Sequence, residues 1–374
     1  MSEAVLTSTQ TQTLEAEPRW VTAAALRDVG LWLLALALAV VAMSTIRPLQ
    51  LPIGLLLVGA VAYTNGANDI SKSIATCVGS GALECRQAVR WGTLCTLVGA
   101  LASVFTAAAL VKTFSSGLLT SSAPLLAPLA IGAIVGAAGW VFFTSRTGLP
   151  VSTTHALTGS IVATGLVLYG SHAVKWPALT QKVALPLLLS PFLGLCLAAA
   201  LILVFKALRL RAGLDVAHWL ASGTTAAARG MNDTPKIVGV AVLLLLATTH
   251  GKTSFLQNAE LALLVAAVMC AGSYFGGMRV IDTLACKVTA MDGREGTAAN
   301  LVTAALVTAA TLRGLPVSTT HVSSGSIVGI GVQGGQGRLN LSVVRDIALA
   351  WLITLPGAGI IAVAASELAT LISR

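Results

Sequence analysis

Two short polar motifs, each present twice, carry the side chains in this chain that are best suited to binding ions. The first is an asparagine–aspartate pair, found at 68–69 and again at 232–233. The second is the octapeptide Gly-Leu-Pro-Val-Ser-Thr-Thr-His, found at 148–155 and again at 314–321. Carboxylate and hydroxyl oxygens are ligands for hard cations, and hydroxyl and amide groups can donate hydrogen bonds to an oxyanion. The residue types therefore predict an ion-binding site.

The two copies belong to a longer internal repeat. Residues 148–165 and 314–331 agree at 13 of 18 positions, at an offset of 166. The aspartate precedes the histidine by 86 residues in the first copy and by 88 in the second, so both motifs keep their order. In an apolar chain, self-similarity of this kind is typical of a transporter with its binding site between the repeats.

Composition places the chain in a membrane. Of its 374 residues, 56% are hydrophobic and 10% are charged, whereas soluble domains carry roughly 25% charged residues. Several apolar runs reach the roughly 20 residues needed to cross a bilayer. The net charge of +9 does not indicate a nucleic-acid surface, because the lysines and arginines cluster in short loops between the apolar runs. We predict a multi-pass protein whose partner is the lipid bilayer and not nucleic acid.

Hydropathy divides each repeat into five elements. We predict a first set at 29–47, 51–83, 91–112, 123–145 and 148–170, a second set at 183–205, 216–249, 259–278, 298–312 and 315–333, and a final helix at 343–371. The predicted fold is an all-α polytopic membrane protein of two inverted-topology repeats, with broken or re-entrant helices and roughly 10–12 transmembrane elements. The predicted division is a polar N-terminal tail 1–28, a first repeat 29–170, a linker with the first helix of the second repeat 171–215, the remainder of that repeat 216–333 and a C-terminal helix 334–374.

Loop charge supports the inversion. Because five is an odd number, corresponding loops of the two repeats should lie on opposite sides of the membrane and carry opposite Lys/Arg bias. The loop after the second element contains Arg86 and Arg90, whereas its counterpart has Lys252 as its one basic residue. The next loop, 114–122, is uncharged, whereas its counterpart, 279–296, contains Arg279, Lys287 and Arg294. This pattern predicts a cytoplasmic N-terminus and an external C-terminus.

The asparagine–aspartate pairs are predicted to interrupt the helices 51–83 and 216–249. Gly66 and Gly230 stand ahead of them, and glycine permits a helix to break and a ligand to approach the backbone. A carboxylate inside a membrane is costly and by default marks a functional site. The alternative, a capped loop at the membrane surface, is weakened by the two copies at matched positions.

Two lysines and two histidines at matched positions allow several interpretations. Lys72 and Lys236 each lie three residues after an aspartate, so each could neutralise the carboxylate, face an anion or extend towards the membrane surface. His155 and His321 could relay protons, although a hydrogen bond near the histidine's own helix start is the favoured interpretation.

The two octapeptides are predicted to start helices. Proline suits a first turn, and the neighbouring hydroxyls can cap free N–H groups, so each segment presents a helix N-terminus to an anion. Capping alone would explain one copy but not an octapeptide repeated verbatim. A further pair, Gly132 and Gly136, has the spacing that favours close packing of two helices.

With these motifs the chain resembles the inorganic phosphate transporter family, whose hallmarks are a Gly-Ala-Asn-Asp motif and a Pro-Val-Ser-Thr-Thr-His motif in each half. The matching segments here are 66–69, 150–155, 230–233 and 316–321, and the likeness extends over nearly the whole chain after about residue 50. Met231 departs from the small residue usual at its place. Lys72 and Lys236 stand where many members have a small or amide side chain.

The resemblance implies a secondary transporter that imports phosphate with sodium or protons by alternating access, without a cofactor, in a bacterial inner membrane. A homodimer is a further implication of the family. The carboxylates of Asp69 and Asp233 would hold the coupling cation or proton. By this likeness the anion and its cation would be surrounded by Asn68, Asp69, Ser152, Thr153, Thr154, Asn232, Asp233, Ser318, Thr319 and Thr320.

Other functions remain open at this point. Some bacterial relatives resemble sulfate permeases, so the resemblance leaves the anion open. An anion channel needs a continuous polar path and no coupled cation, which two buried aspartates fit poorly. An enzyme would need a nucleophile and a base, and Ser152 with His155 is the one candidate, with its repeat copy. Because that pair is better explained as a helix start, we expect no enzymatic activity.

Overall fold

A computed structural model of the chain describes residues 23–120, 123–209, 214–249, 254–335 and 337–373. Within these ranges every regular element is a helix, and the β pairing consists of two isolated bridges, Leu119–Val174 and Thr289–Leu339. Most of the predicted tail 1–28 lies outside the described residues, and its last six positions already belong to the first helix, which starts at Ala23.

The helices follow the apolar runs of the sequence. In chain order they are α2 (Ala23–Thr45), η1 (Arg47–Leu49), α3 (Gln50–Asp69), α4 (Ser71–Gly79), α5 (Cys85–Thr106), α6 (Ala108–Lys112), η2 (Thr113–Gly117), α7 (Ala127–Thr147), α8 (Thr153–Tyr169), η3 (Ser171–Ala173), α9 (Trp176–Ala178), η4 (Leu179–Ala184), α10 (Leu185–Ala207), α11 (Leu214–Thr249), α12 (Phe255–Gly276), α13 (Met278–Asp282), η5 (Thr283–Lys287), α14 (Gly293–Leu312), α15 (Thr319–Gln333) and α16 (Leu341–Ser373).

Eight helical segments among the described residues are long and apolar enough to cross a membrane. The helices α8 and α15 are shorter, with 17 and 15 residues, and pack among the spans together with α14. The prediction of an all-helical, multi-pass membrane fold is confirmed. The inverted orientation of the two repeats stays a prediction.

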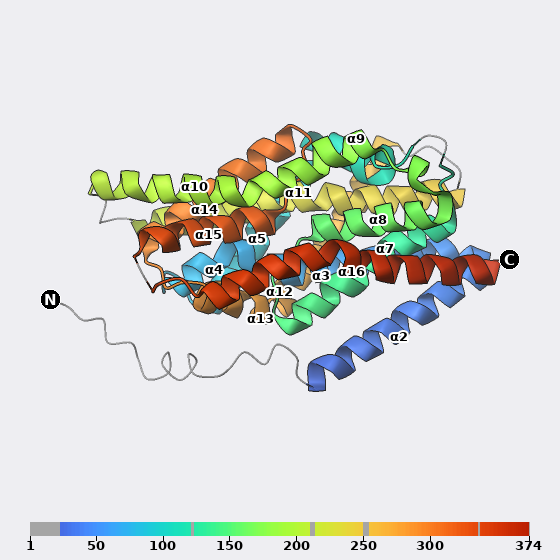
Figure 1. Cartoon of the computed structure of the whole chain (residues 1–374), viewed down its shortest axis with the longest axis horizontal. Coiled ribbons are helices and arrows are strands. Elements are labelled where there is room, and N and C mark those ends of the chain that lie inside the picture. Colours follow the sequence, from blue (N-terminus) through green and yellow to red (C-terminus); the bar gives the residue numbers. More distant parts are fainter. Residues whose placement is uncertain (1–22, 121–122, 210–213, 250–253, 336, 374) are drawn as a thin grey trace.

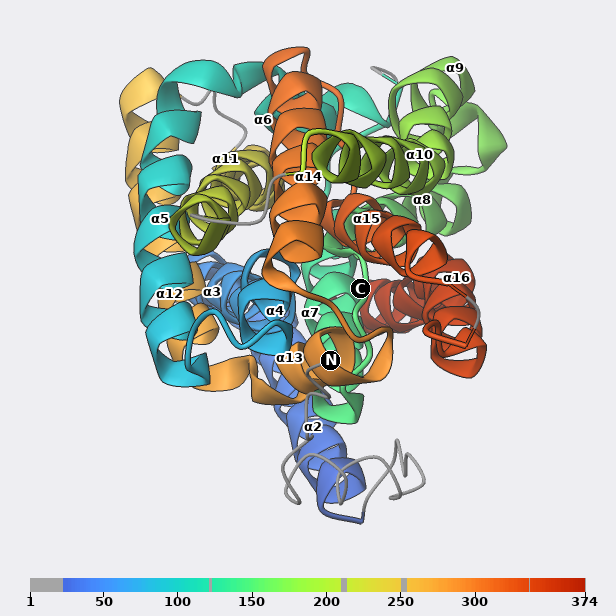
Figure 2. The same cartoon turned by 90° about the vertical axis from the view of Figure 1, so that its left-hand side faces the viewer.

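The helices α10, α11 and α16 run along the long axis of the molecule (Figure 1). Viewed from the end, α11 lies between α5 and α12 on one side and α14 on the other (Figure 2). The helix α2 lies at the edge of the bundle, where it packs against α16, α7 and α3. The long helix α11 is therefore surrounded by protein, and most of its side chains are buried.

The apolar interior has two main parts. One cluster of buried side chains is centred on α3, α7, α8 and the second half of α11, and includes Val58, Ile134 and Leu244. The other lies among α4, α10, α14, α15 and η5, and includes Ile74 and Ile327.

The predicted helix breaks at these pairs are wrong. Helix α11 runs without interruption through Asn232 and Asp233 for 36 residues. Between α3 and α4 one residue, Ile70, separates the helices, and its angles of φ −56° and ψ −36° are helical. The asparagine and aspartate side chains do not cap their own helices, because they bond to groups on other elements and to lysines of the following turn. The chain instead breaks before α8 and α15, and at Ala107 and Gly277.

The glycine ahead of each pair has a packing role. A Cβ atom on Gly66 would overlap the carbonyl oxygen of Met269 on α12, and one on Gly230 would overlap that of Thr96 on α5. Each glycine therefore lets a neighbouring helix approach to backbone contact. The predicted close packing at Gly132 is also confirmed, because a Cβ there would crowd the carbonyl oxygen of Ala362 on α16.

The order of elements suggests where the repeat units begin and end. Helices of 22 and 5 residues followed by a π-helix of 5 residues occur as α5, α6 and η2 and again as α12, α13 and η5. One isolated bridge precedes α9 and α10, and the other precedes α16. We therefore propose repeat units at 50–207 and 214–373, with α2 outside the pair, in place of the predicted division in which 183–205 opens the second repeat.

Replacing Gly66 by alanine is expected to destabilise the protein by about 1–3 kcal/mol, because the new methyl group would push the α12 backbone away. Gly59→Ala is the matched control, since a Cβ at Gly59 on the same helix would make only an ordinary contact with Val268. Denaturant unfolding of both purified variants in detergent micelles measures the difference. Equal stability of the two would contradict the packing role of Gly66.

Candidate functional site

Both octapeptides start a helix in the way the sequence predicts. Ser152 is the N-cap of α8, and its hydroxyl accepts a hydrogen bond from the backbone N–H of His155 at 3.2 Å. Ser318 caps α15 in the same way through His321, also at 3.2 Å. These caps leave the other N–H groups of each first turn, together with the positive ends of two helix dipoles, near the centre of the protein.

The two helix starts are bonded to each other across the repeats. The hydroxyl of Thr154 donates to the carbonyl of Val317 at 3.3 Å, and that of Thr320 donates to the carbonyl of Val151 at 2.6 Å. All four residues are buried. The reciprocal bonds hold the N-terminal turns of α8 and α15 against each other.

In the first repeat, Lys72 connects the aspartate to its helix start. Its ammonium pairs with the carboxylate of Asp69 and donates to the side-chain oxygen of Asn68 at 2.7 Å and to the carbonyl of Val151 at 3.2 Å. The amide of Asn68 donates in turn to the hydroxyl of Ser145 at 3.1 Å. The asparagine–aspartate pair therefore faces the segment between α7 and α8.

The second repeat has the same arrangement. The ammonium of Lys236 donates to the carboxylate of Asp233 at 3.1 Å, to the hydroxyl of Thr154 at 2.7 Å and to the carbonyl of Val317 at 2.8 Å. The amide of Asn232 also donates to Val317, at 3.1 Å. Each lysine thus takes the first of its three predicted roles and neutralises its aspartate.

Asn65 links the two halves. Its amide donates to the hydroxyl of Thr153 at 2.9 Å and to the carboxylate of Asp233, from the other repeat, at 3.4 Å. Its oxygen makes no hydrogen bond within the described part of the chain. A buried acceptor of this kind is available to a ligand that can donate a hydrogen bond.

Arg229, like Asn65, is a residue of this cluster whose role was not predicted from the sequence. Its side chain is fully buried, and its Nε lies 3.9 Å from the carboxylate of Asp233. One terminal nitrogen donates to Ser273 at 3.2 Å, whereas Nε and Nη1 make no hydrogen bond with any described residue. The available signal was the spacing, because Arg229 and Asn65 hold equivalent positions four residues before each aspartate, on the same helical face.

The cluster carries an excess of positive charge. Two lysines and one arginine face two aspartates, all at most 2% exposed, which leaves one formal positive charge in the interior. An unbalanced buried charge is costly unless a counter-ion completes the site. With two helix N-termini and two guanidinium nitrogens that make no hydrogen bond with described residues, the arrangement suits an oxyanion.

All ten predicted site residues are buried, and they lie on the four elements that meet here, α3, α8, α11 and α15, or directly before α8 and α15. They differ in how they are used. Ser152 and Ser318 serve as helix caps, while the hydroxyl of Thr319 makes no hydrogen bond in the described structure. Among the described residues, no group of three or more His, Cys, Asp or Glu side chains could hold a metal ion.

The two histidines lie side by side below the helix starts. The ring centroids of His155 and His321 are 4.7 Å apart, and His321 also contacts Trp351 at 4.0 Å. The Nδ1 of His321 bonds to the carbonyl of Leu187 at 2.9 Å, so this ring contacts α10 as well as its own helix start. The contact between the two rings is thus a second connection between α8 and α15, in addition to the hydrogen bonds of Thr154 and Thr320.

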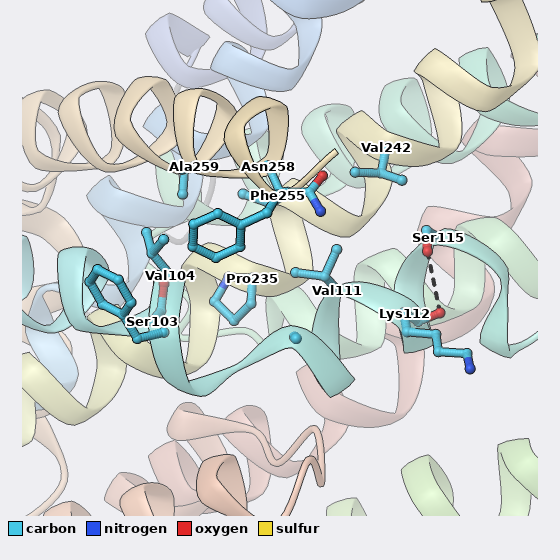
Figure 3. Close-up of a pocket in the computed structure, with 14 residues that line it drawn as sticks. Ser103, Val104, Val111, Lys112, Ser115, Pro235, Val242, Phe255, Asn258 and Ala259 are labelled. Atoms are coloured by element: carbon cyan, nitrogen blue, oxygen red, sulfur yellow. Dashed lines mark hydrogen bonds between the residues drawn. The ribbon is translucent and has the colours of Figure 1, made fainter. Parts of the chain in front are cut away.

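A cavity of about 310 Å³ lies beside the site and not within it (Figure 3). It is lined by Pro235 and Val242 of α11, Val111 of α6 and Phe255 of α12, and by none of the paired-motif residues. The polar groups around it are few and include Lys112 and Asn258. This lining does not suit a doubly charged anion.

The comparisons with known proteins agree with one another. Residues 65–362 match the model of the "Phosphate transporter family". A protein of Rhizobium meliloti named "Probable low-affinity inorganic phosphate transporter" is 30% identical, over 82% of this chain and 94% of its own length. A protein of the same name from Mycobacterium leprae is 32% identical, over 79% of this chain and 72% of its own. A solved structure named "The sodium-dependent phosphate transporter" has the same fold, with a TM-score of 0.77, 23% identity, and coverage of 86% of this chain and 99% of that one.

Replacing Thr154 or Thr320 by valine is expected to lower the free energy of unfolding by about 1–2 kcal/mol, because each change removes a buried bond between the repeats. Thr158→Val is the control, since its buried hydroxyl makes no hydrogen bond among the described residues. Denaturant unfolding of the three variants provides the measurement. If Thr158→Val cost as much as the other two, the reciprocal bonds would not be what holds the helix starts together.

Proposed function

The chain belongs to the phosphate transporter family, and we propose that it is a secondary active transporter that imports inorganic phosphate in symport with a cation. The proposed membrane is the inner membrane of a bacterium, because the helices can span a bilayer and relatives of the chain come from bacteria. The single observation that carries the proposal is the buried cluster with one excess positive charge between two helix N-termini.

Arg229 and the helix starts are the proposed ligands of the anion. The Nε and Nη1 of Arg229 are without hydrogen bonds to described residues, so the guanidinium still has N–H groups to donate to phosphate oxygens. The hydroxyls of Thr153 and Thr319 and the N–H groups of the two first turns would complete the shell, with Asn68, Asn232 and the capping serines holding these turns in place.

The geometry favours phosphate over sulfate. At neutral pH phosphate still carries protons that it can donate, whereas sulfate carries none. The oxygen of Asn65 is a buried acceptor without a donor among the described residues. A P–OH group would satisfy this acceptor, and sulfate would leave it unpaired at a cost of about 1–3 kcal/mol.

The two lysines next to the aspartates favour one coupling ion over another. Asp69 and Asp233 are the proposed carriers of the coupling cation, and each already pairs with the ammonium of Lys72 or Lys236. A sodium ion would have to displace that ammonium or lie beside a second positive charge. A proton instead needs no new space, because it can be exchanged within the ion pair. We therefore favour the proton as the coupling ion, with sodium as the other outcome of the test.

Alternating access would separate the two halves around the anion. Among the hydrogen bonds that cross between them near the site are those of Asn65 to Asp233 and of Thr154 and Thr320 to the opposite carbonyls. Bonds of this kind can be exchanged for others as the repeats move, with the anion and its coupling ion occupying the site between them.

Proteoliposomes containing the wild-type protein are expected to accumulate radiolabelled phosphate when a proton gradient is imposed, and excess unlabelled sulfate should not suppress this uptake. Uptake that follows a sodium gradient alone would assign sodium as the coupling ion. If labelled sulfate accumulated and suppressed phosphate uptake, the protein would be a sulfate permease, and a current without coupling would identify a channel.

Asp69→Asn is expected to abolish this uptake, because it removes the carboxylate that carries the coupling ion and balances Lys72. The double variant Asp69→Asn with Lys72→Gln restores the charge balance for folding but should remain inactive. Wild-type uptake by either folded variant would show that the carboxylate has no part in coupling.

Arg229→Gln is expected to raise the KM for phosphate by at least about tenfold, because it removes the buried positive charge and its charge-assisted hydrogen bonding to the anion. Arg345→Gln is the control, since Arg345 is exposed and pairs with Asp346 next to it. Initial uptake rates over a range of phosphate concentrations give the KM of each variant. An unchanged KM in folded Arg229→Gln would exclude the guanidinium as an anion ligand.

A further inference from the structure

The internal repeat allows each half of the protein to be compared with the other, position by position. On α4, the face that continues from Lys72 towards the helix end carries Ser73, Thr76 and Ser80, at three- and four-residue spacing. At the offset of 164 set by the two aspartates, the counterparts on α11 are Ile237, Val240 and Leu244. The first face is polar and the second is apolar, although both are buried up to the last turn.

The first half of α11 shows the same contrast. The residues that lead towards Arg229 on one face are His218, Ser222 and Thr225, at four- and three-residue spacing. Their counterparts on α3 are Gly54, Val58 and Val61. All six are buried.

Helix α14 completes the pattern. It carries Thr297, Asn300 and Thr303, all buried, whereas the counterparts on α7, at the offset of 166, are Ile131, Ile134 and Ala137. One end of the protein therefore has a polar seam, made of these faces of α4, α11 and α14. The other end has an apolar seam, made of the corresponding faces of α11, α3 and α7.

The polar seam is connected by hydrogen bonds. The hydroxyl of Thr76 accepts from the amide of Asn300 at 2.7 Å and lies 3.0 Å from the Nε2 of His218. The hydroxyl of Thr225 donates to the carbonyl of Asn300 at 2.9 Å. In the apolar seam the position of the His218–Ser80 contact is taken by Gly54 and Leu244, which pack directly on each other.

The seam runs from the site to a charged surface. At its inner end, Ser323 of α15 donates to the carbonyl of Lys72 at 2.8 Å, and Arg229 lies one turn of α11 beyond Thr225. At its outer end, the ring of His218 lies against Gly296 in the first turn of α14, next to the ion pair of Glu295 and Arg338. The segment 279–296 at this end contains three Lys and Arg residues, whereas its counterpart 114–122 has none, and the positive-inside rule therefore places this end in the cytoplasm.

We propose that the polar seam is the route by which phosphate and its coupling ion leave the site for the cytoplasm, and that the apolar seam is the closed gate towards the other side. Helix packing alone does not require the polar side chains, because the apolar seam reaches the same burial without them. Intramembrane polar groups that are not needed for packing mark a pathway for water and ions. The direction of transport in this inference rests on the proposed function.

Cysteine accessibility tests the route without measuring transport. Thr76→Cys and Ser222→Cys place a thiol in the polar seam, and Val240→Cys and Val58→Cys place one at the matched positions of the apolar seam. A small, charged methanethiosulfonate reagent is added to membrane vesicles of each orientation, and peptide mass spectrometry reads each position, so that the native cysteines can remain. We expect the first two thiols to react from the cytoplasmic face at least about tenfold faster than the matched pair.

Equal labelling of the matched positions, or no labelling of the polar seam from the cytoplasmic face, would overturn the route. The labelling experiment uses no gradient and no substrate. It can therefore contradict the route while phosphate uptake is still observed, and it can support the route while uptake is absent.

A second pair of variants separates a pathway from a packing role. Thr76→Val and Asn300→Ile give the polar seam the side-chain types of its counterpart. If the seam is the route, phosphate uptake per folded protein should fall at least about tenfold, while phosphate protection against thermal unfolding persists. Lower stability with unchanged uptake per folded protein would mean that the polar groups only join the helices, and would refute the proposal.

Discussion

Five charged side chains lie in the interior of this membrane protein, and the helices around them must keep their charges balanced. Asp69, Lys72, Arg229, Asp233 and Lys236 are all buried, and ions in such surroundings persist only when other charges and hydrogen-bonding groups surround them. The ion pairs within each repeat satisfy four of the five. The remaining positive charge is the basis of the proposed anion site, because a negatively charged ligand would complete the balance.

The surrounding helices are arranged to bring these charges together. Helices α3 and α11 can approach α12 and α5 closely because Gly66 and Gly230 lack a side chain, and each helix carries its aspartate one turn further on. The helix starts of α8 and α15 point their free N–H groups at the same place, where Val151 and Val317 supply carbonyl oxygens to the lysines. The polar segments between α7 and α8 and between α14 and α15 are thus tolerated inside the membrane, because their backbone groups are bonded to side chains.

Much of this arrangement could be predicted from the sequence. The octapeptides start helices as expected, and the paired motifs do meet, because a repeated pattern in an apolar chain leaves few other places for polar groups. The helix breaks at the aspartates were predicted wrongly. Asn68 and Asn232 are turn formers by propensity, but their side chains bond to Leu149 and Val317 of neighbouring segments, and the helices continue. Arg229 and Asn65 were missed because they differ in type, although they hold equivalent positions, so comparing the motifs by identity concealed them.

An electron cryomicroscopy structure of the protein determined in saturating phosphate would test whether the buried charges bind the anion. We expect density for the anion between the first turns of α8 and α15, within hydrogen-bonding distance of the Arg229 guanidinium and the side-chain oxygen of Asn65. Density in the cavity beside Phe255, or an unchanged cluster without an anion under conditions in which phosphate is transported, would contradict the claim that the unbalanced buried charge is the binding site.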